Sequence, residues 1–260
     1  MYGFGLSERN PFFVFDWNFS DASNDASRRF ALINRPKETS VLMDLIDADS
    51  LIHYSLWAEL PKNHPVGELW LETETDLKAT IYLAYGGFFR QALTILRSWF
   101  EIAVHGVYFS DHWGQSTEKY EQWRKGARNA PAHVGDLTRA LASRTDKLVA
   151  VDQPYISARL EPVYSFLSKQ THAQGLDMYN LQKGRDNVPR FLERSFDIWY
   201  QKTLEAFDAL CFLYEIFFIK PLVSYFNGSP QERKRLQDSS NSLSGLMPSY
   251  GLLVGVVLSF

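Results

Sequence analysis

Between residues 86 and 105, four polar side chains recur at a spacing that places them on one side of a helix. Arg90, Arg97, Glu101 and His105 share that side at about 100° per residue, and apolar residues occupy the other. An arginine can bind a phosphate through paired N–H groups, and Glu101 is one helical turn from Arg97 and can orient it. If the row faces a crevice in a bundle, Arg90 and Arg97 are candidates for phosphate binding. If it faces water, the row is an ordinary solvated surface.

A second group combines a hydroxyl with an imidazole. Ser168 and His172 are four residues apart, so a helix would place both on one face. A histidine takes up or releases a proton near neutral pH and is the most frequent general acid or base. A histidine near the C-terminus of a helix is also favoured simply because its cation complements the helix dipole. Both interpretations of His172 stay open at the level of the sequence.

Other sequence features argue against a metal centre and against the common cofactor-binding folds. His105 and His112 flank Asp111, but their spacing is not that of paired helical ligands and a third ligand is lacking nearby. The Walker loop, the Gly-rich dinucleotide fingerprint, the HExxH zinc motif and the nucleophile elbow are all missing. Cys211 is the single cysteine and lies in an apolar run, where a buried thiol is expected. We therefore expect no metal and no cofactor.

The composition is that of a packed globular protein. Of the 260 residues, 45% are hydrophobic and 15% are aromatic, which excludes a disordered chain. The formal net charge of -3 excludes nucleic-acid binding driven by bulk positive charge, although a local arginine cluster can still contact a phosphate. The N-terminus lacks the pattern of a signal peptide, and apolar runs fall short of the ~20 residues that span a bilayer. We expect a cytoplasmic protein without a membrane partner.

Apolar periodicity predicts an all-α fold, a helical bundle that would position these residues. Apolar residues recur three and four positions apart over most of the chain, and proline and glycine mark the ends of the periodic segments. Segments 67–85 and 86–109 are expected to form an antiparallel hairpin broken at Gly86 and Gly87, and Pro221 is expected to bend or stop the last helix. The expected helices cover residues 38–60, 67–85, 86–109, about ten residues after Gly114, 136–148, 154–172 and 190–220.

The two ends of the chain differ from this helical middle. Residues 12–19 are expected to form a strand or an extended aromatic segment, which leaves room for minor β structure, and residues 20–25 a turn. Residues 228–245 are polar and are expected to be a linker. The apolar residues 251–260 are a strand or tail packed on the chain's own core, a tail that docks a partner, or the start of a further segment. The predicted organisation is an N-terminal arm, a helical bundle domain, and a linker with an apolar tail, over residues 1–37, 38–222 and 223–260.

Two of these segments resemble a known family. The pattern A-L-x-x-L-R-S-x-x-E over Ala92–Glu101, followed by Y-x-x-L-S-x-x-x-H over Tyr164–His172, is similar to that of bacterial HEPN-like helical proteins of the DUF5677 kind. The resemblance covers about residues 70–185. HEPN-like proteins are helical bundles that often dimerise, and many are metal-independent RNases that act as toxins or antiphage effectors. The resemblance therefore implies a homodimer or larger assembly, RNA as a partner and a role in antiviral defence.

The resemblance also implies catalytic roles for individual residues. HEPN ribonucleases carry an arginine a few residues before the catalytic histidine, but here residues 165–167 are Ser, Phe and Leu, so Arg97 would supply the guanidinium from across the bundle. His172 would act on the ribose 2′-hydroxyl or the leaving oxygen, and Arg97 would hold the scissile phosphate. Glu101 would orient Arg97, and Ser168 would add a hydrogen bond. The rival hypothesis is a catalytically silent helical scaffold that uses its aromatic arm and apolar tail to bind a protein partner or itself.

Overall fold

The computed structural model describes residues 17–60, 66–111, 117–126, 134–143, 154–171 and 191–260. Every regular element in these residues is a helix, so the predicted all-α fold is confirmed. The helices are α2 (Trp17–Asn34), α3 (Pro36–Glu59), α4 (Gly67–Tyr85), α5 (Phe89–Asp111), α6 (Thr117–Arg124), α7 (Val134–Ala142), α8 (Pro154–Thr171), α9 (Glu193–Gly228), α10 (Pro230–Leu243) and α11 (Pro248–Ser259). Within the described residues, none of them combines the length and apolar character that crossing a membrane requires.

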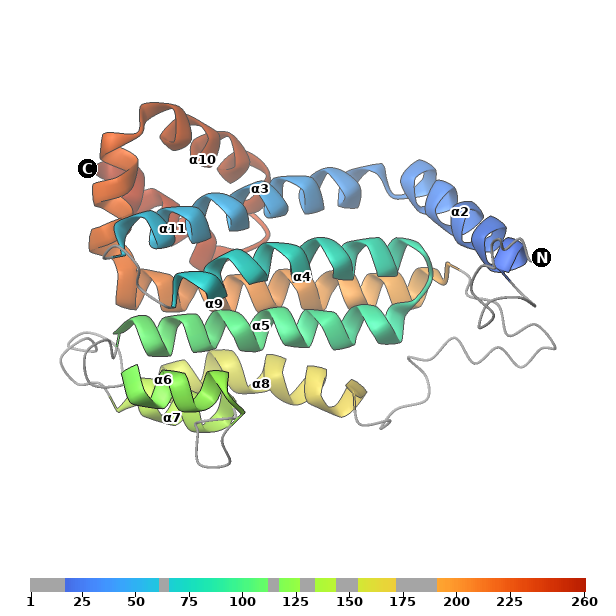
Figure 1. The fold of residues 1–260 in the computed structure, drawn as a ribbon. Coiled ribbons are helices and arrows are strands. Elements are labelled where there is room, and N and C mark those ends of the chain that lie inside the picture. Colours follow the sequence, from blue (N-terminus) through green and yellow to red (C-terminus); the bar gives the residue numbers. More distant parts are fainter. Residues whose placement is uncertain (1–16, 61–65, 112–116, 127–133, 144–153, 172–190) are drawn as a thin grey trace, which may run out of the picture.

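α4 and α5 form the antiparallel hairpin that the sequence predicts (Figure 1). Gly87, in the connection between them, has a φ of 83°, a left-handed conformation that glycine adopts without steric penalty. The two helices also approach closely, because a Cβ added at Gly106 of α5 would lie 2.6 Å from the ring of Trp70 on α4. The hairpin therefore depends on one glycine for its turn and on another for its packing.

α9 is the longest helix and lies along α4 and α5 (Figure 1). Thr80 of α4 joins all three helices. Its hydroxyl donates to the backbone oxygen of Ala92 on α5 at 2.6 Å and accepts from Nε1 of Trp199 on α9 at 3.0 Å. Trp99 of α5 and Phe207 of α9 stack with ring centres 6.4 Å apart, and both are fully buried. Large aromatic side chains bury much apolar surface, so α9 is the element on which the hairpin packs.

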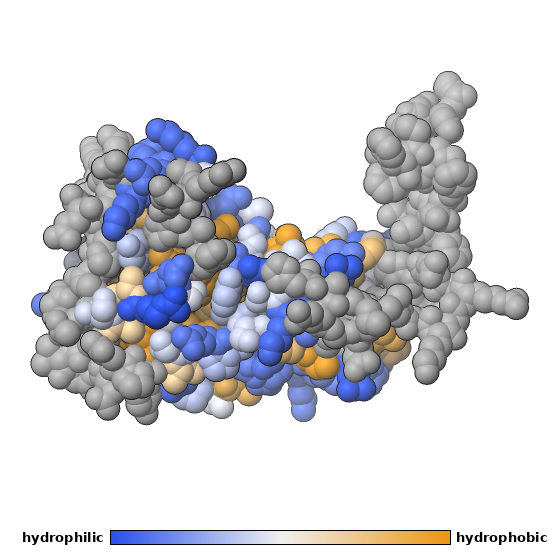
Figure 2. All heavy atoms as spheres, turned by 90° about the horizontal axis from the view of Figure 1, so that it is seen from below, coloured by the Kyte–Doolittle hydropathy of each residue, from blue (hydrophilic) through white to orange (hydrophobic). Residues whose placement is uncertain are grey.

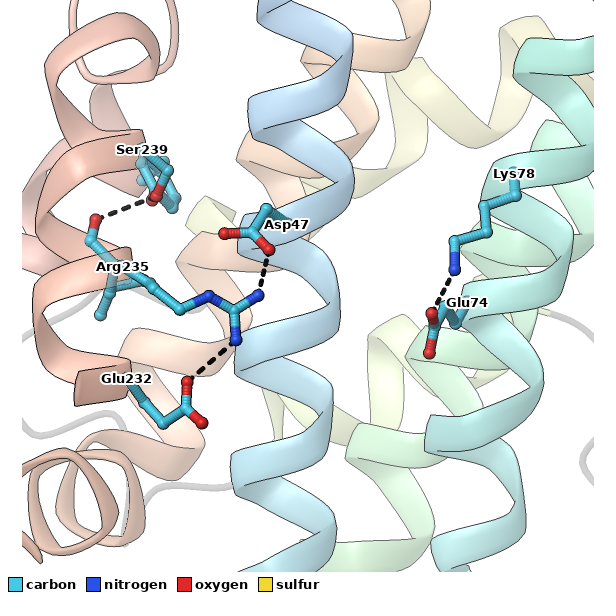
Figure 3. A network of polar contacts seen from close by, with 8 residues as sticks. Asp47, Glu74, Lys78, Glu232, Arg235 and Ser239 are labelled. Carbon is cyan, nitrogen blue, oxygen red and sulfur yellow. Dashed lines mark hydrogen bonds and ion pairs between the residues drawn. The ribbon is translucent and has the colours of Figure 1, made fainter. Parts of the chain in front are cut away.

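The C-terminal helices fold back onto the bundle, with α11 packed along α9 and α10 against α3 (Figure 1). α10 is mostly polar, and its contact with α3 includes two polar links besides the buried Leu236. Arg235 reaches from α10 to Asp47 of α3, as Figure 3 shows. Ser242 donates to Asp44 of α3 at 2.5 Å. Because both side chains of the Arg235 ion pair are exposed, it contributes little stability.

Three segments that were not expected to be helices are helical. Residues 20–25, an expected turn, lie inside α2, residues 228–245 contain α10, and residues 251–260 belong largely to α11. Pro230 and Pro248 stand in the first turns of α10 and α11, where a proline removes no intrahelical hydrogen bond. The polar residues that suggested a linker therefore form a helix, and a proline begins each of the last two helices.

Pro221 does not stop α9, which continues to Gly228. Leu222 and Phe226, beyond the proline, are buried, and the burial of these side chains outweighs the backbone hydrogen bond that proline removes. At the other end of the chain, residues 17–19 of the expected N-terminal strand begin α2, and the rest of that strand lies outside the described residues.

Candidate functional site

The guanidinium of Arg97 lies between Glu101 of its own helix and Tyr164 of α8. Its Nε donates to Glu101 Oε1 at 2.8 Å, and its Nη2 donates to Tyr164 Oη at 3.3 Å. The guanidinium carbon is 5.4 Å from the centre of the Tyr164 ring, within the range of a cation–π contact. The Arg97 and Glu101 side chains are 20% and 28% exposed, so the group is partly buried. The two segments that carry the HEPN-like resemblance therefore touch through these side chains.

The amphipathic character of α5 and α8 explains this arrangement. α5 buries Leu96 and Phe100 in the core, and α8 buries Leu160 and Leu167. With these residues directed inward, Arg97 lies at the edge of the α5 contact with α8, where the partly buried tyrosine can cover it. Arg97, Glu101 and Tyr164 therefore meet because the apolar sides of α5 and α8 pack against the core and leave these polar residues at the edge of the contact.

Burial and charge act in opposite directions on Arg97. Burial disfavours its charged form, but the hydrogen bond and the charge of Glu101 outweigh burial, so the pKa of Arg97 is raised above its ordinary value. Burial also raises the pKa of Tyr164, and the charge of Glu101 adds to this effect. At neutral pH the group therefore presents a permanent cation beside a protonated phenol.

α5 and α8 run in opposite directions (Figure 1), which decides where the other candidate residues lie. Ser168 is partly buried and stands one turn beyond Tyr164 on α8. Because the helices are antiparallel, a residue of α8 beyond Tyr164 lies farther from Arg97 along the helix axis and closer to Arg90. Arg90 is exposed and precedes Arg97 by about two turns of α5. The structure thus places Ser168 between the levels of the two candidate arginines.

Of the two candidate histidines, His105 and His172, the structure describes only His105. His172 directly follows Thr171, the last residue of α8, and lies outside the described residues, so its role stays a prediction. His105 does not share an open face with Arg97. It is buried, its Nδ1 is 2.7 Å from the backbone oxygen of Glu101, and its ring stacks on Trp123 of α6 at 4.6 Å. Packing of α6 against this end of α5 divides the expected polar row.

No group of three His, Cys, Asp or Glu side chains in the described part of the chain is arranged to hold a metal ion. Asp111 is the last residue of α5, and His112 lies outside the described residues. The histidine pair considered from the sequence is therefore represented in the structure only by the buried His105.

Sequence reasoning missed a buried polar cluster formed by Asp49, His53, Thr73 and Tyr214. His53 Nε2 is 2.6 Å from Tyr214 Oη on α9, and His53 Nδ1 is 2.8 Å from Thr73 Oγ1 on α4. The same Nδ1 is 3.3 Å from Asp49 Oδ1, one turn earlier on α3. Trp70 stacks on the imidazole with ring centres 5.2 Å apart. Asp49 and His53 are 0% and 2% exposed, so the cluster joins α3, α4 and α9 inside the core.

Part of this cluster was detectable in the sequence. Asp49 and His53 are one turn apart in an apolar helix, and Ile52 and Leu56 define the buried side on which both fall. Two polar residues at core positions one turn apart are expected to lie close to each other. Tyr214 is separated from His53 by 161 residues, and helical spacing carries no information about such a contact.

No model of a known protein family matches the chain, and neither does any curated protein or solved structure. The HEPN-like resemblance therefore rests on the two short sequence patterns, and the contact between Arg97 and Tyr164 joins the helices that carry them. The buried cluster around His53 lies outside both patterns.

Proposed function

We propose that the protein is a HEPN-like, metal-independent endoribonuclease that acts as a toxin effector in bacterial antiphage defence. The observation that supports this proposal is the hydrogen bond from Arg97 of α5 to Tyr164 of α8. It brings a cation to α8 at Tyr164, about two turns before Thr171, the residue that directly precedes His172 in the chain. RNA cleavage needs both groups at one phosphate, so the proposal requires the segment that follows α8 to bring His172 back toward Arg97.

In this proposal the ribose 2′-hydroxyl attacks the adjacent phosphorus, and the 5′-oxygen of the next nucleotide leaves. His172 either removes the proton from the 2′-hydroxyl while water protonates the leaving 5′-oxygen, or protonates the leaving 5′-oxygen while water takes up the 2′-hydroxyl proton. Arg97 stabilises the negative charge that builds up on the phosphate oxygens, and Ser168 adds a hydrogen bond. The products are a 2′,3′-cyclic phosphate and a 5′-hydroxyl.

Glu101 would act by holding the guanidinium in place before the substrate arrives. A fixed cation stabilises a transition state better than a mobile one because it needs no reorganisation during the reaction. The surface around α8 is compatible with a polar substrate: seen from below (Figure 2), hydrophilic residues are spread over the described part of this face, with hydrophobic residues between them. Because the net charge is -3, RNA would be held by local contacts and not by bulk charge.

A cleavage assay on labelled single-stranded RNA in the presence of EDTA tests the proposal. We expect fragments that end in a 2′,3′-cyclic phosphate, and a rate that falls about 100-fold or more in Arg97→Ala and in His172→Ala. Arg139→Ala is the matched control, because Arg139 is an exposed arginine paired with Asp136 within α7. Wild-type protein that leaves RNA intact, or an Arg97→Ala variant that cleaves as fast as wild type, would rule the proposal out.

A second candidate function, the non-catalytic helical scaffold, is favoured by the outer side of α11. This helix contains no charged residue, and it buries Leu253 and Val254 against the bundle. On the other side, Leu252 is 61% exposed and the terminal Phe260 is 75% exposed. An uncharged apolar surface of this kind suits a contact with a protein partner or with a second copy of the chain.

Deletion of residues 251–260 is a poor test of the scaffold because it would also uncover the core under α11. Leu252→Glu changes only the outer side, so it should reduce the assembly size measured by light scattering while leaving the unfolding midpoint nearly unchanged. Leu71→Glu on α4 is the control, since Leu71 is 50% exposed on another surface. An assembly size that is the same in wild type, Leu252→Glu and Leu71→Glu would argue against a scaffold built through α11.

A further inference from the structure

The Tyr164 hydroxyl stands beside the cation that would hold the scissile phosphate. Its Oη accepts a hydrogen bond from Nη2 of Arg97 at 3.3 Å, and the guanidinium carbon lies 5.4 Å from the centre of the Tyr164 ring. The Nε of Arg97 donates to Glu101 at 2.8 Å, so the edge of the guanidinium formed by Nε and Nη2 faces these two residues. A phosphate bound to Arg97 would therefore have the phenol as a neighbour.

The phenol of Tyr164 keeps a hydrogen that it can donate. Burial raises the pKa of Tyr164, and the charge of Glu101 and a hydrogen bond with Glu101 add to this effect, whereas Arg97 lowers the pKa. Because the O–H turns about the bond between ring and oxygen, it can move from Glu101 to a substrate oxygen while the ring stays in place. Glu101 would still accept the hydrogen bond from Arg97 Nε. A substrate can thus engage this hydroxyl without any change in how α5 and α8 pack.

The cleavage reaction would bring a ribose hydroxyl to the same place. An oxygen of a phosphate bound to Arg97 would lie about 2.7–2.9 Å from a guanidinium nitrogen. The 2′-oxygen that attacks this phosphate has to approach the phosphorus to about 3–3.5 Å. Tyr164 Oη is itself 3.3 Å from Nη2, so it borders the volume that both groups would occupy. Ser168 stands about one helical turn farther along α8, which makes Tyr164 the better placed of these two hydroxyls.

We propose that the Tyr164 hydroxyl binds the ribose 2′-hydroxyl next to the phosphate on Arg97, so that the site selects RNA over DNA. This inference rests on the proposed function, in which the same 2′-hydroxyl is the nucleophile. The phenol donates to a lone pair of the 2′-oxygen, which leaves the hydrogen of the 2′-hydroxyl to the group that removes it. Tyr164 forms no covalent bond and gives up no proton, so it is a residue that determines specificity.

Arg97 and Tyr164 would then have separable effects on binding. RNA and DNA carry the same phosphate charges, so a contact between Arg97 and a phosphate contributes to the affinity for both. The 2′-hydroxyl is the group by which a protein tells RNA from DNA at a given site. A single hydrogen bond between uncharged groups changes an affinity by about three- to tenfold. Loss of the Tyr164 hydroxyl should therefore weaken the binding of RNA by that factor and leave the binding of DNA unchanged.

Tyr164→Phe is the diagnostic variant because it removes the hydroxyl and keeps the ring beside Arg97. Tyr82→Phe is the matched control. Tyr82 on α4 is an exposed tyrosine outside the candidate site, and it also has an arginine over its ring, with the guanidinium carbon of Arg28 3.9 Å from the ring centre. Both substitutions are made in a His172→Ala protein, so that cleavage does not destroy the RNA during the binding measurement.

The experiment is fluorescence anisotropy of the full chain with three labelled single strands of one sequence that contains only A and C. The strands are RNA, DNA and 2′-fluoro RNA, which keeps the sugar shape of RNA but lacks the hydroxyl. We expect the His172→Ala protein to bind RNA about three to ten times more tightly than the other two strands. This preference should disappear in Tyr164→Phe and persist in Tyr82→Phe. Arg97→Ala should weaken the binding of all three strands by a similar factor.

The ratio of the RNA affinity to the 2′-fluoro RNA affinity decides the outcome. A ratio near one in the His172→Ala protein, or a ratio that Tyr164→Phe leaves unchanged, overturns recognition by Tyr164. A purely structural role would lower the affinity for all three strands together, and it would fail by the second criterion. The cleavage assay judges the proposed function separately. A preference that depends on Tyr164 in a protein that never cuts RNA overturns the nuclease alone, and cleavage with a preference independent of Tyr164 overturns the recognition alone.

Discussion

Asp208 of α9 caps the N-terminus of α11 by accepting two hydrogen bonds from Ser249. Its Oδ1 accepts the backbone N–H of Ser249 at 2.7 Å, and its Oδ2 accepts the hydroxyl at 3.1 Å. At the other end of α11, Arg233 of α10 donates to the backbone oxygen of Leu258 at 2.6 Å. An acidic group at the N-terminus and a cation at the C-terminus both complement the helix dipole. A helix without charges of its own is thus held by charges from two neighbouring helices.

Replacement of Asp208 by Ala should destabilise the fold by about 1–2 kcal/mol, because the first backbone N–H groups of α11 lose their acceptor. Asp208→Asn keeps an acceptor oxygen and should cost less. The measurement is the free energy of unfolding in urea at neutral pH. Asp136→Ala on α7 is the control, since that carboxylate is exposed. A cost for Asp208→Ala no larger than for Asp136→Ala would contradict the capping role.

Two glycines allow a matched comparison of helix packing. Gly106→Ala should destabilise by about 1–3 kcal/mol, because the new methyl group would lie 2.6 Å from the Trp70 ring. Gly255→Ala in α11 meets open space and should stabilise by up to about 1 kcal/mol through helix propensity. Thermal unfolding of both variants should show opposite shifts. A Gly106→Ala variant at least as stable as wild type would mean that the α4–α5 contact is looser than described.

The Arg97–Glu101 pair should contribute little to stability. Both groups are partly exposed, so a double-mutant cycle of Arg97→Ala and Glu101→Ala should give a coupling of about 0.5 kcal/mol or less. The pair spans one turn of α5, with Arg97 before Glu101, the less favourable order in a helix. A coupling above about 2 kcal/mol would indicate a mainly structural pair. The unfolding free energies of the single variants also show how much of any loss of RNA cleavage comes from a loss of folded protein.

The Cys211 thiol should be unreactive in the folded protein. Burial raises its pKa well above the usual value, and Asp208 and Asp49 add to the effect. Because an unfolded thiol ionises near about pH 8.5, the stability linked to the folded thiol is complete below that pH and is lost as the pH rises above it. Labelling with a thiol reagent at about pH 8 should be at least about 100-fold slower in native protein than in guanidinium. Equal rates would mean that the thiol is accessible.

Helix positions in the middle of the chain could be predicted because their residues repeat with the helical period. The expected helix over 38–60 is α3, and the expected hairpin is α4 with α5. The C-terminal region could not be predicted in the same way. α10 is polar on most sides, and α11 is apolar nearly all round, so neither shows a clear periodic stripe. Both contact partners elsewhere in the chain, such as Asp208 for α11 and Asp47 for α10.

The candidate site was predictable only within each helix. The spacing of Arg97 and Glu101 predicted their ion pair, but not the approach of Tyr164 from a helix 67 residues away. His105 was misjudged because α6 covers that part of α5 through Trp123. The His53 cluster shows the same limit, since its polar groups come from three helices and only Asp49 and His53 are neighbours in sequence.

The contacts of α9 with the first half of the chain have a consequence for folding order. Trp199 bonds to Thr80 across 119 residues, and Tyr214 bonds to His53 across 161 residues. During synthesis on the ribosome, α3, α4 and α5 emerge long before α9. The apolar surfaces that α9 covers in the folded protein stay exposed to solvent until then. Contacts of such high sequence separation slow folding because long loops have to close first. The nascent chain is therefore expected to need protection from aggregation, by a chaperone for instance, until α9 has left the exit tunnel.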